Sequence, residues 1–183
     1  MLRPAYIFAA ISLNDLSATM SVNALPPHQG ISPFELAPGE IIRYLSASTR
    51  QSLAINLRNP LNDINVRIKV GDGSLYVTNR RFVFVTASQG DVSSFVVDFS
   101  RARSLRFSHS LESPWFGPNY WQFRFFSPPD GSCSGFPKGE WFDGKAVFKD
   151  GGVVEFVSVV DDVLNDAVNN SQIDEELPRY SEQ

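Results

Sequence analysis

The feature that most constrains the fold is a long series of short β-type runs, which extends from Glu40 to Asp150. The clearest part is GDGSLYVTNRRFVFVTAS, residues 71–88. Its glycines at 71 and 73 predict a tight turn, residues 75–78 a strand, Asn79-Arg80 a second turn, and residues 82–86 another strand. Further runs at 92–99, 102–107, 119–127 and 140–150 are rich in aromatic and β-branched residues, which favour strands.

A helical period begins only after the glycines at 151 and 152. Apolar residues then recur at the three-to-four spacing of one helix face: Val153, Phe156, Val157, Val160, Val163, Leu164, Ala167 and Val168. Acidic residues fall on the opposite side: Glu155, Asp161, Asp162 and Asp166. We therefore predict a mainly β (α+β) fold, with about seven antiparallel strands in a PH-like barrel whose open end is plugged by one C-terminal amphipathic helix.

Charge and composition divide the chain into three parts. Residues 140–183 hold 11 Asp and Glu against 3 Lys and Arg, whereas residues 1–139 hold 13 Lys and Arg against 9 Asp and Glu. We predict a flexible N-terminal extension over 1–34, one domain over 35–170, and an acidic, disordered tail over 171–183. The N-terminal 19 residues weakly resemble a signal peptide, and the mature chain could instead begin at Met20.

A single cysteine, Cys133, excludes an internal disulfide bond and a cysteine-based zinc site. It fits a reducing compartment, so we expect a cytoplasmic or nuclear protein. The sequence has no apolar run long enough for a transmembrane helix. The mild positive charge of the domain is too small to predict direct nucleic-acid binding.

Three motifs occur in an order and spacing that resemble the GRAM-domain family of WW-domain-binding proteins. The first resembles the G-x-L-Y-x-T-x-x-R-x-x-F signature of GRAM domains and comprises Gly73, Leu75, Tyr76, Thr78, Arg81 and Phe84. The second is PWFGPNYWQFRF at 114–125. The third spans 139–146 and continues through the FKDGGVVEF segment at 148–156. Together they cover roughly residues 35–170.

The resemblance implies a PH-like (GRAM) fold, no catalytic activity, and an adaptor or transcription-coactivator role exercised through WW domains. This chain lacks the P-P-x-Y motifs of that family and has the L-P-x-Y variant at Leu177, Pro178 and Tyr180. WW domains bind extended polyproline-type segments, and a proline also holds its preceding residue extended. We therefore expect binding to the WW domain of a ubiquitin ligase or transcription regulator.

Two alternative functions stay open. The first is a peripheral phosphoinositide-binding or membrane-binding module, because basic clusters attract anionic lipids. Its candidate contacts are Arg67, Lys69, Arg80, Arg101 and Arg103. The same side chains could equally form a solvated strand face, with Arg81 tied into a turn. The second alternative is a scaffold subunit that binds protein partners through the face of the barrel.

Catalysis and metal binding have little support in the sequence, and we predict no enzyme activity, cofactor or metal site. His28 and His109 are not at ligand spacing, and His109 between Ser108 and Ser110 indicates a turn. The aspartates at 161, 162 and 166 are typical of an exposed acidic helix face. We expect Trp115, Trp121 and Trp141 to be core residues.

Overall fold

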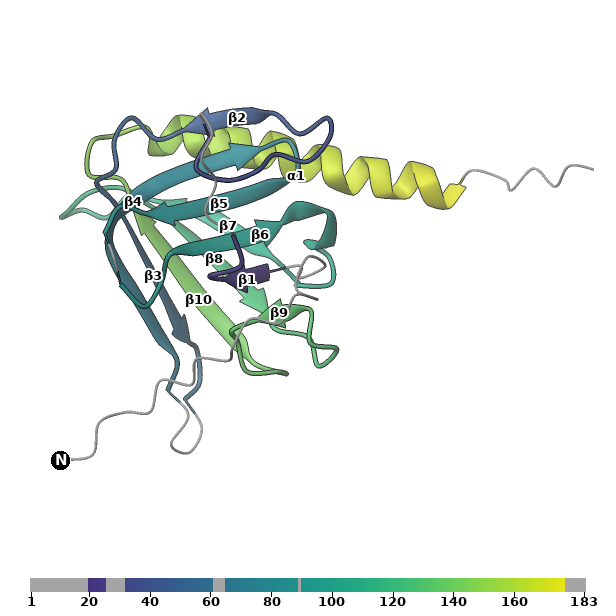
Figure 1. Ribbon diagram of the computed structural model, residues 1–183, viewed down its shortest axis with the longest axis horizontal. Helices are drawn as coiled ribbons and strands as arrows, with labels where there is room; N and C mark the ends of the chain where they lie inside the picture. Colours follow the sequence, from purple (N-terminus) through teal and green to yellow (C-terminus); the bar gives the residue numbers. More distant parts are fainter. Residues whose placement is uncertain (1–19, 26–31, 61–64, 89, 177–183) are drawn as a thin grey trace, which may run out of the picture.

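The computed structural model describes residues 20–25, 32–60, 65–88 and 90–176 (Figure 1). These residues form ten strands, one short 3-10 helix and one long α-helix. The strands are β1 (Met20–Val22), β2 (Ile42–Leu45), β3 (Gln51–Leu57), β4 (Arg67–Thr78), β5 (Arg81–Thr86), β6 (Ser94–Asp98), β7 (Ser108–Glu112), β8 (Tyr120–Phe126), β9 (Cys133–Ser134) and β10 (Trp141–Val147). The helices are η2 (Phe99–Arg101) and α1 (Val153–Glu176).

All ten strands belong to one sheet, in the order β7-β8-β10-β3-β4-β5-β6-β1-β9, with β2 paired to β4 outside this path. The seven strands from β7 to β6 in this order are antiparallel to their neighbours. The two ends of the path, β7 and β9, do not pair with each other. The predicted mainly β fold with a C-terminal helix is confirmed. The predicted barrel of about seven strands is wrong, because the sheet is open and gains the short strands β1, β2 and β9.

The sheet bends over its own core. Strands β5 and β8 are four positions apart in the sheet, which would separate them by about 19 Å if the sheet were flat. Instead, the rings of Phe82 and Trp121 lie 5.0 Å apart, and those of Phe95 and Phe123 lie 5.9 Å apart. The inner faces of the two halves therefore enclose one aromatic core, and Figure 1 shows β3 and β10 crossing steeply below β5 and β6.

Helix α1 closes this core with the apolar face that the sequence predicts. Val153, Phe156, Val160 and Val163 are buried, and the Phe156 ring lies 5.0 Å from that of Trp121. The helix begins after Gly152, whose φ of +89° suits glycine. It ends at Glu176, six residues beyond the predicted end of the domain. The apolar period stops earlier, but the next helix breaker along the sequence is Pro178.

Three local predictions were wrong. Residues 71–73 do not form a turn but lie within the twelve-residue strand β4, whereas the turn at 79–80 is confirmed. Residues 102–107, predicted as a strand, form turns after η2, because Asp98 accepts a hydrogen bond from the Ser100 N–H and starts a 3-10 turn. Strand β7 follows at 108–112, where a turn was predicted around His109.

The N-terminal segment packs on the outer face of β5 and β6. Phe34 is fully buried against Val83 and Val96, and Leu25 and Leu36 pack around this second small cluster. Strand β1 also pairs with β6. Residues 20–25 and 32–34 thus differ from the flexible extension predicted for 1–34, while residues 1–19 lie outside the described residues. The reason is that β5 and β6 have apolar side chains on both faces, and the N-terminal segment shields the outer ones from water.

Candidate anion-binding face

Positive charge gathers on the outer face of the half of the sheet formed by β7, β8, β10, β3 and β4. Side chains on these strands alternate, so Trp121 and Phe123 point into the core while Gln122 and Arg124 point outward. The strand register brings the outward residues into two rows. One row is Ser108, Arg124, Asp143, Asn56 and Arg67, and the next is Ser110, Gln122, Lys145, Ala54 and Lys69.

We call the five cations on this surface the basic face: Arg58, Arg67, Lys69, Arg124 and Lys145. Arg58 follows β3 beside Trp141, whose carbonyl accepts its backbone N–H at 2.9 Å. Asp143 is the one acidic residue in the two rows, and Glu112 lies at the far corner, where it accepts a 2.7 Å hydrogen bond from the Ser110 hydroxyl. The face therefore carries a clear positive excess in a chain whose formal net charge is −4.

The five cations differ in how they are held. Arg124 donates from Nε to Asp143 at 2.7 Å, and the Lys145 ammonium lies 3.7 Å from the centre of the Tyr120 ring. Arg58, Arg67 and Lys69 are exposed, and their side chains form no hydrogen bond or ion pair with the part of the chain that the structure describes. These three cations therefore differ from Arg124 and Lys145, which contact other side chains of the sheet.

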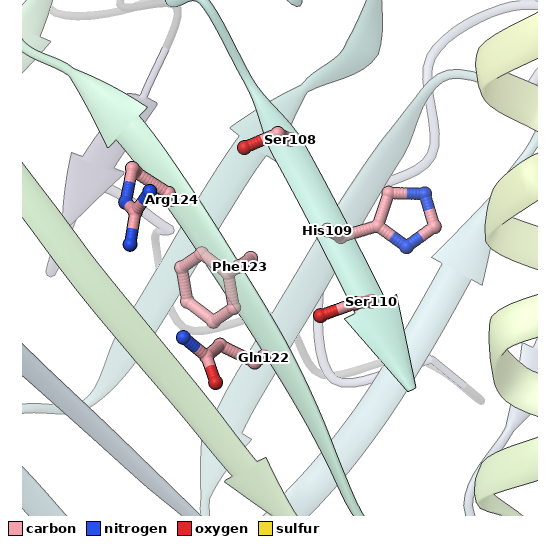
Figure 2. Close-up of a pocket in the computed structure, with 6 residues that line it drawn as sticks. All are labelled: Ser108, His109, Ser110, Gln122, Phe123 and Arg124. Atoms are coloured by element: carbon pink, nitrogen blue, oxygen red, sulfur yellow. The ribbon is translucent and has the colours of Figure 1, made fainter. Parts of the chain in front are cut away.

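A shallow polar hollow lies at the β7–β8 end of this face. Figure 2 shows Ser108, Ser110, Gln122 and Arg124 around it, while His109 points from β7 toward α1. Hydroxyl, amide and guanidinium groups can all donate hydrogen bonds to an anionic oxygen. The hollow adds neutral donors to the cations of the basic face.

The structure brings together only part of the predicted lipid-contact set. Arg67 and Lys69 are near the start of β4 and belong to the basic face. Arg80 lies beyond the other end of β4, where its Nη2 donates to the Pro38 carbonyl at 3.0 Å. Arg101 lies in η2 and Arg103 in the turn that follows. Arg58, Arg124 and Lys145 were not in the predicted set, because their neighbours on this surface come from strands that are distant in the sequence.

The Thr78 and Arg81 side chains, at the end of β4 and the start of β5, have a structural role. Glu40 accepts hydrogen bonds from Arg81 Nε at 2.7 Å, Arg81 Nη2 at 3.0 Å and the Thr78 hydroxyl at 2.7 Å. The backbone N–H of Ala37 donates to the same carboxylate at 2.8 Å. Burial raises the pKa of Glu40, but these hydrogen bonds outweigh it and hold the pKa below its ordinary value. Arg81 therefore ties the segment that contains Glu35 and Glu40 to the start of β5.

His109 links β7 to α1. Its Nε2 lies 3.3 Å from the Asp161 carboxylate, and burial lowers the pKa of the imidazole while Asp161 opposes that shift. Because β7 alternates, Ser108 and Ser110 face outward, away from the imidazole, so these three residues do not form a base–nucleophile pair. Cys133 is buried, which raises the pKa of its thiol.

The three tryptophans have different environments. Trp121 is fully buried, as predicted, and Trp141 is half-buried. Trp115 is 93% exposed and Phe116 87% exposed, so the prediction that Trp115 is a core residue is wrong. Both lie in the β7–β8 loop, where no described side chain covers them.

The predicted WW ligand, Leu177, Pro178 and Tyr180, lies outside the described residues. Within the described part of the chain, no helix has the length and apolar character needed to cross a membrane. The same residues contain no cluster of three or more His, Cys, Asp or Glu side chains that could hold a metal ion.

Comparisons with known proteins add little. No protein-family model and no curated protein matches the sequence. Among solved structures, the chain is similar to the Vps36 N-terminal PH domain, with 13% identity over 74% of this chain and 87% of that one and a TM-score of 0.49. It is also similar to a chain of the 8S snRNP assembly intermediate, with 11% identity over 78% and 90% and a TM-score of 0.42. Both TM-scores are below 0.5, so neither match establishes a shared fold.

Proposed function

We propose that this protein is a non-catalytic, peripheral binding protein that docks its basic face on an anionic lipid surface. The observation that carries the proposal is the convergence of five cations on one outward sheet face, three of which have no hydrogen-bond or ion-pair partner among the residues that the structure describes. Helix α1 packs on the inner side of β8, through Phe156 and Trp121, so its acidic residues lie away from this face. This charge separation would orient the domain toward a negative surface.

We also infer a PH-like fold for the domain. The support is two antiparallel meanders, β3-β4-β5-β6 and β7-β8-β10, which are joined by the β10–β3 pair and bent around a core that the C-terminal helix plugs. The resemblance of the sequence motifs to GRAM domains points the same way.

The expected affinity of the basic face alone is low. A lysine or arginine near an anionic bilayer contributes about 1 kcal/mol. Three free cations therefore contribute about 3 kcal/mol, which corresponds to dissociation constants in the millimolar range or weaker. Binding of this kind is screened by salt, because the contacts are exposed.

The basic face is tested by charge reversal. We expect Arg67→Glu/Lys69→Glu to reduce binding to phosphatidylcholine vesicles that contain phosphatidylserine by about tenfold or more, since each reversal replaces an attraction of about 1 kcal/mol with a repulsion. Co-sedimentation at low and high salt measures this. Arg101→Glu/Arg103→Glu is the matched control, with the same change in net charge away from the face. Equal loss of binding in both variants would contradict a localised site.

We propose, as a second function, that the C-terminal segment is a WW-domain ligand. The supporting observation is the length of α1: Ala167 packs against the core, and the helix continues to Glu176, about 14 Å further on. Figure 1 shows this part of the helix extending beyond the sheet. Leu177 follows directly, so the helix would hold the motif away from the domain.

This second function is tested with the 183-residue chain and a panel of purified WW domains. We expect binding at micromolar dissociation constants, about 8 kcal/mol, and a loss of at least about tenfold in Tyr180→Ala, because the tyrosine fills a separate pocket. Arg179→Ala, whose side chain is expected to face solvent, should bind as the unchanged chain does. Binding that survives in Tyr180→Ala would show that the L-P-x-Y motif is not the ligand.

A further inference from the structure

We propose that Trp115 and Phe116 form an aromatic anchor that inserts into the same anionic lipid surface. This inference rests on the proposed lipid-binding function of the basic face. The two side chains are adjacent in the β7–β8 loop and are 93% and 87% exposed. Large aromatic side chains at such exposure are typical of surfaces that meet a partner or a membrane, and tryptophan is enriched where proteins meet the bilayer interface.

The loop has a backbone suited to holding the two rings outward. Pro114 and Pro118 flank them, and each proline fixes its own φ angle. Gly117 has a φ of +100°, which other residues rarely adopt, and a side chain there would meet no neighbouring atom. The exposure of Trp115 and Phe116 is therefore built into a restricted turn.

The anchor lies at the border of the basic face. Glu112 and Tyr120 are the last cross-strand pair before the loop. Tyr120 carries the Lys145 ammonium over its ring, and Lys145 shares its row with Lys69. The row of Lys69 and Lys145 is followed, toward the β7–β8 loop, by the row of Tyr120 and Glu112, and then by the loop itself. A planar surface that contacts the two lysines would thus also meet the aromatic loop.

A lipid surface explains this combination better than a second copy of the chain. Two copies that met through this loop would bring together two faces that each carry an excess of positive charge, and their repulsion is unfavourable. An anionic bilayer complements both parts, since headgroups attract the cations and the interfacial region accepts the rings. Stable attachment of a peripheral protein generally needs two such signals.

The anchor is tested with phosphatidylcholine vesicles with and without phosphatidylserine. Because Trp121 is buried and Trp141 half-buried, a change in the exposed Trp115 should dominate the fluorescence response. We expect a blue shift with the anionic vesicles, quenching by brominated acyl chains, and loss of both effects in Trp115→Phe. Trp115→Ser/Phe116→Ser should bind these vesicles at least about tenfold more weakly, because apolar burial is lost. Val154→Ser removes an exposed apolar side chain elsewhere and should have no effect.

The outcomes separate this inference from the proposed function. If Trp115→Ser/Phe116→Ser binds as the unchanged chain does and no blue shift occurs, the anchor is overturned, whereas sensitivity to Arg67→Glu/Lys69→Glu still supports the basic face. If the unchanged chain binds neither type of vesicle, both proposals fail. A shift that occurs equally with vesicles lacking phosphatidylserine would contradict coupling of the anchor to the basic face.

Discussion

Replacing Glu40 with alanine is expected to lower the free energy of unfolding by about 3–5 kcal/mol, the range found when one partner of a buried ion pair is removed. The Glu40 side chain is 1% exposed and that of Arg81 21%. The substitution removes the acceptor for Arg81, for the Thr78 hydroxyl and for the Ala37 N–H at once. It leaves a largely buried guanidinium without its carboxylate, which is the costly part of the change.

Equilibrium urea unfolding measures this effect, and Arg50→Ala provides the control. Arg50 also forms an ion pair, with Asp150 at 3.2 Å, but both partners are at the surface. Exposed pairs contribute about 0–1 kcal/mol, so Arg50→Ala should change stability little. Similar losses in the two variants would show that the Glu40–Arg81 pair is no more important than a surface pair.

The same carboxylate predicts a pH dependence. The folded-state pKa of Glu40 is lowered, so its contribution is present above its unfolded-state pKa of about 4.3 and is lost as the pH falls through the folded-state value. The stability difference between the unchanged chain and Glu40→Gln should thus be largest above about pH 5 and shrink below about pH 4. A difference that grows with acidification would contradict this assignment.

The sequence predicted correctly those elements that are determined by residues close together in the chain. The apolar period that begins at Val153 correctly predicted the start of α1, and Asn79-Arg80 correctly predicted the turn between β4 and β5. The strand prediction for 102–107 failed because alternating arginine and apolar residues imitate a strand, whereas the Asp98 cap starts a 3-10 turn. The burial of β5 on both faces could have been predicted, because an unbroken apolar run places side chains on both sides of a strand. Phe82, Val83 and Phe84 form such a run, and all three are buried.

The candidate site could not be predicted in the same way, because it depends on pairing between distant segments. Lys145 lies in the same row as Lys69, two strands away, only because β10 pairs with β3 and β3 with β4, and β10 is about ninety residues from β3 in the sequence. A one-residue change of register would send Lys145 into the core. Composition therefore indicated a basic domain, but only the register of four strands defines its basic face.

Replacing Gly144 with alanine is expected to destabilise the protein by about 3 kcal/mol, at the upper end of the usual cost of overpacking. A Cβ atom at this position in β10 would lie 2.0 Å from Cζ and 2.2 Å from Cε2 of Phe123. The ring cannot easily move, because it stacks on Trp121 at 4.5 Å and on Phe95 at 5.9 Å. The glycine thus makes room for an aromatic ring that joins the two halves of the sheet.

Gly71→Ala is the matched control for this prediction. Gly71 also lies within a strand, but a Cβ atom there would have no neighbour within 4 Å. Its replacement should therefore change stability by no more than about 0.5 kcal/mol, as for other surface substitutions. Chemical unfolding of both variants, together with Gly144→Ala/Phe123→Leu, measures the effect. Because the smaller leucine relieves the clash, the double variant should lose less than the sum of the two single losses. Additive losses would mean that the clash with Phe123 is not the reason for glycine at position 144.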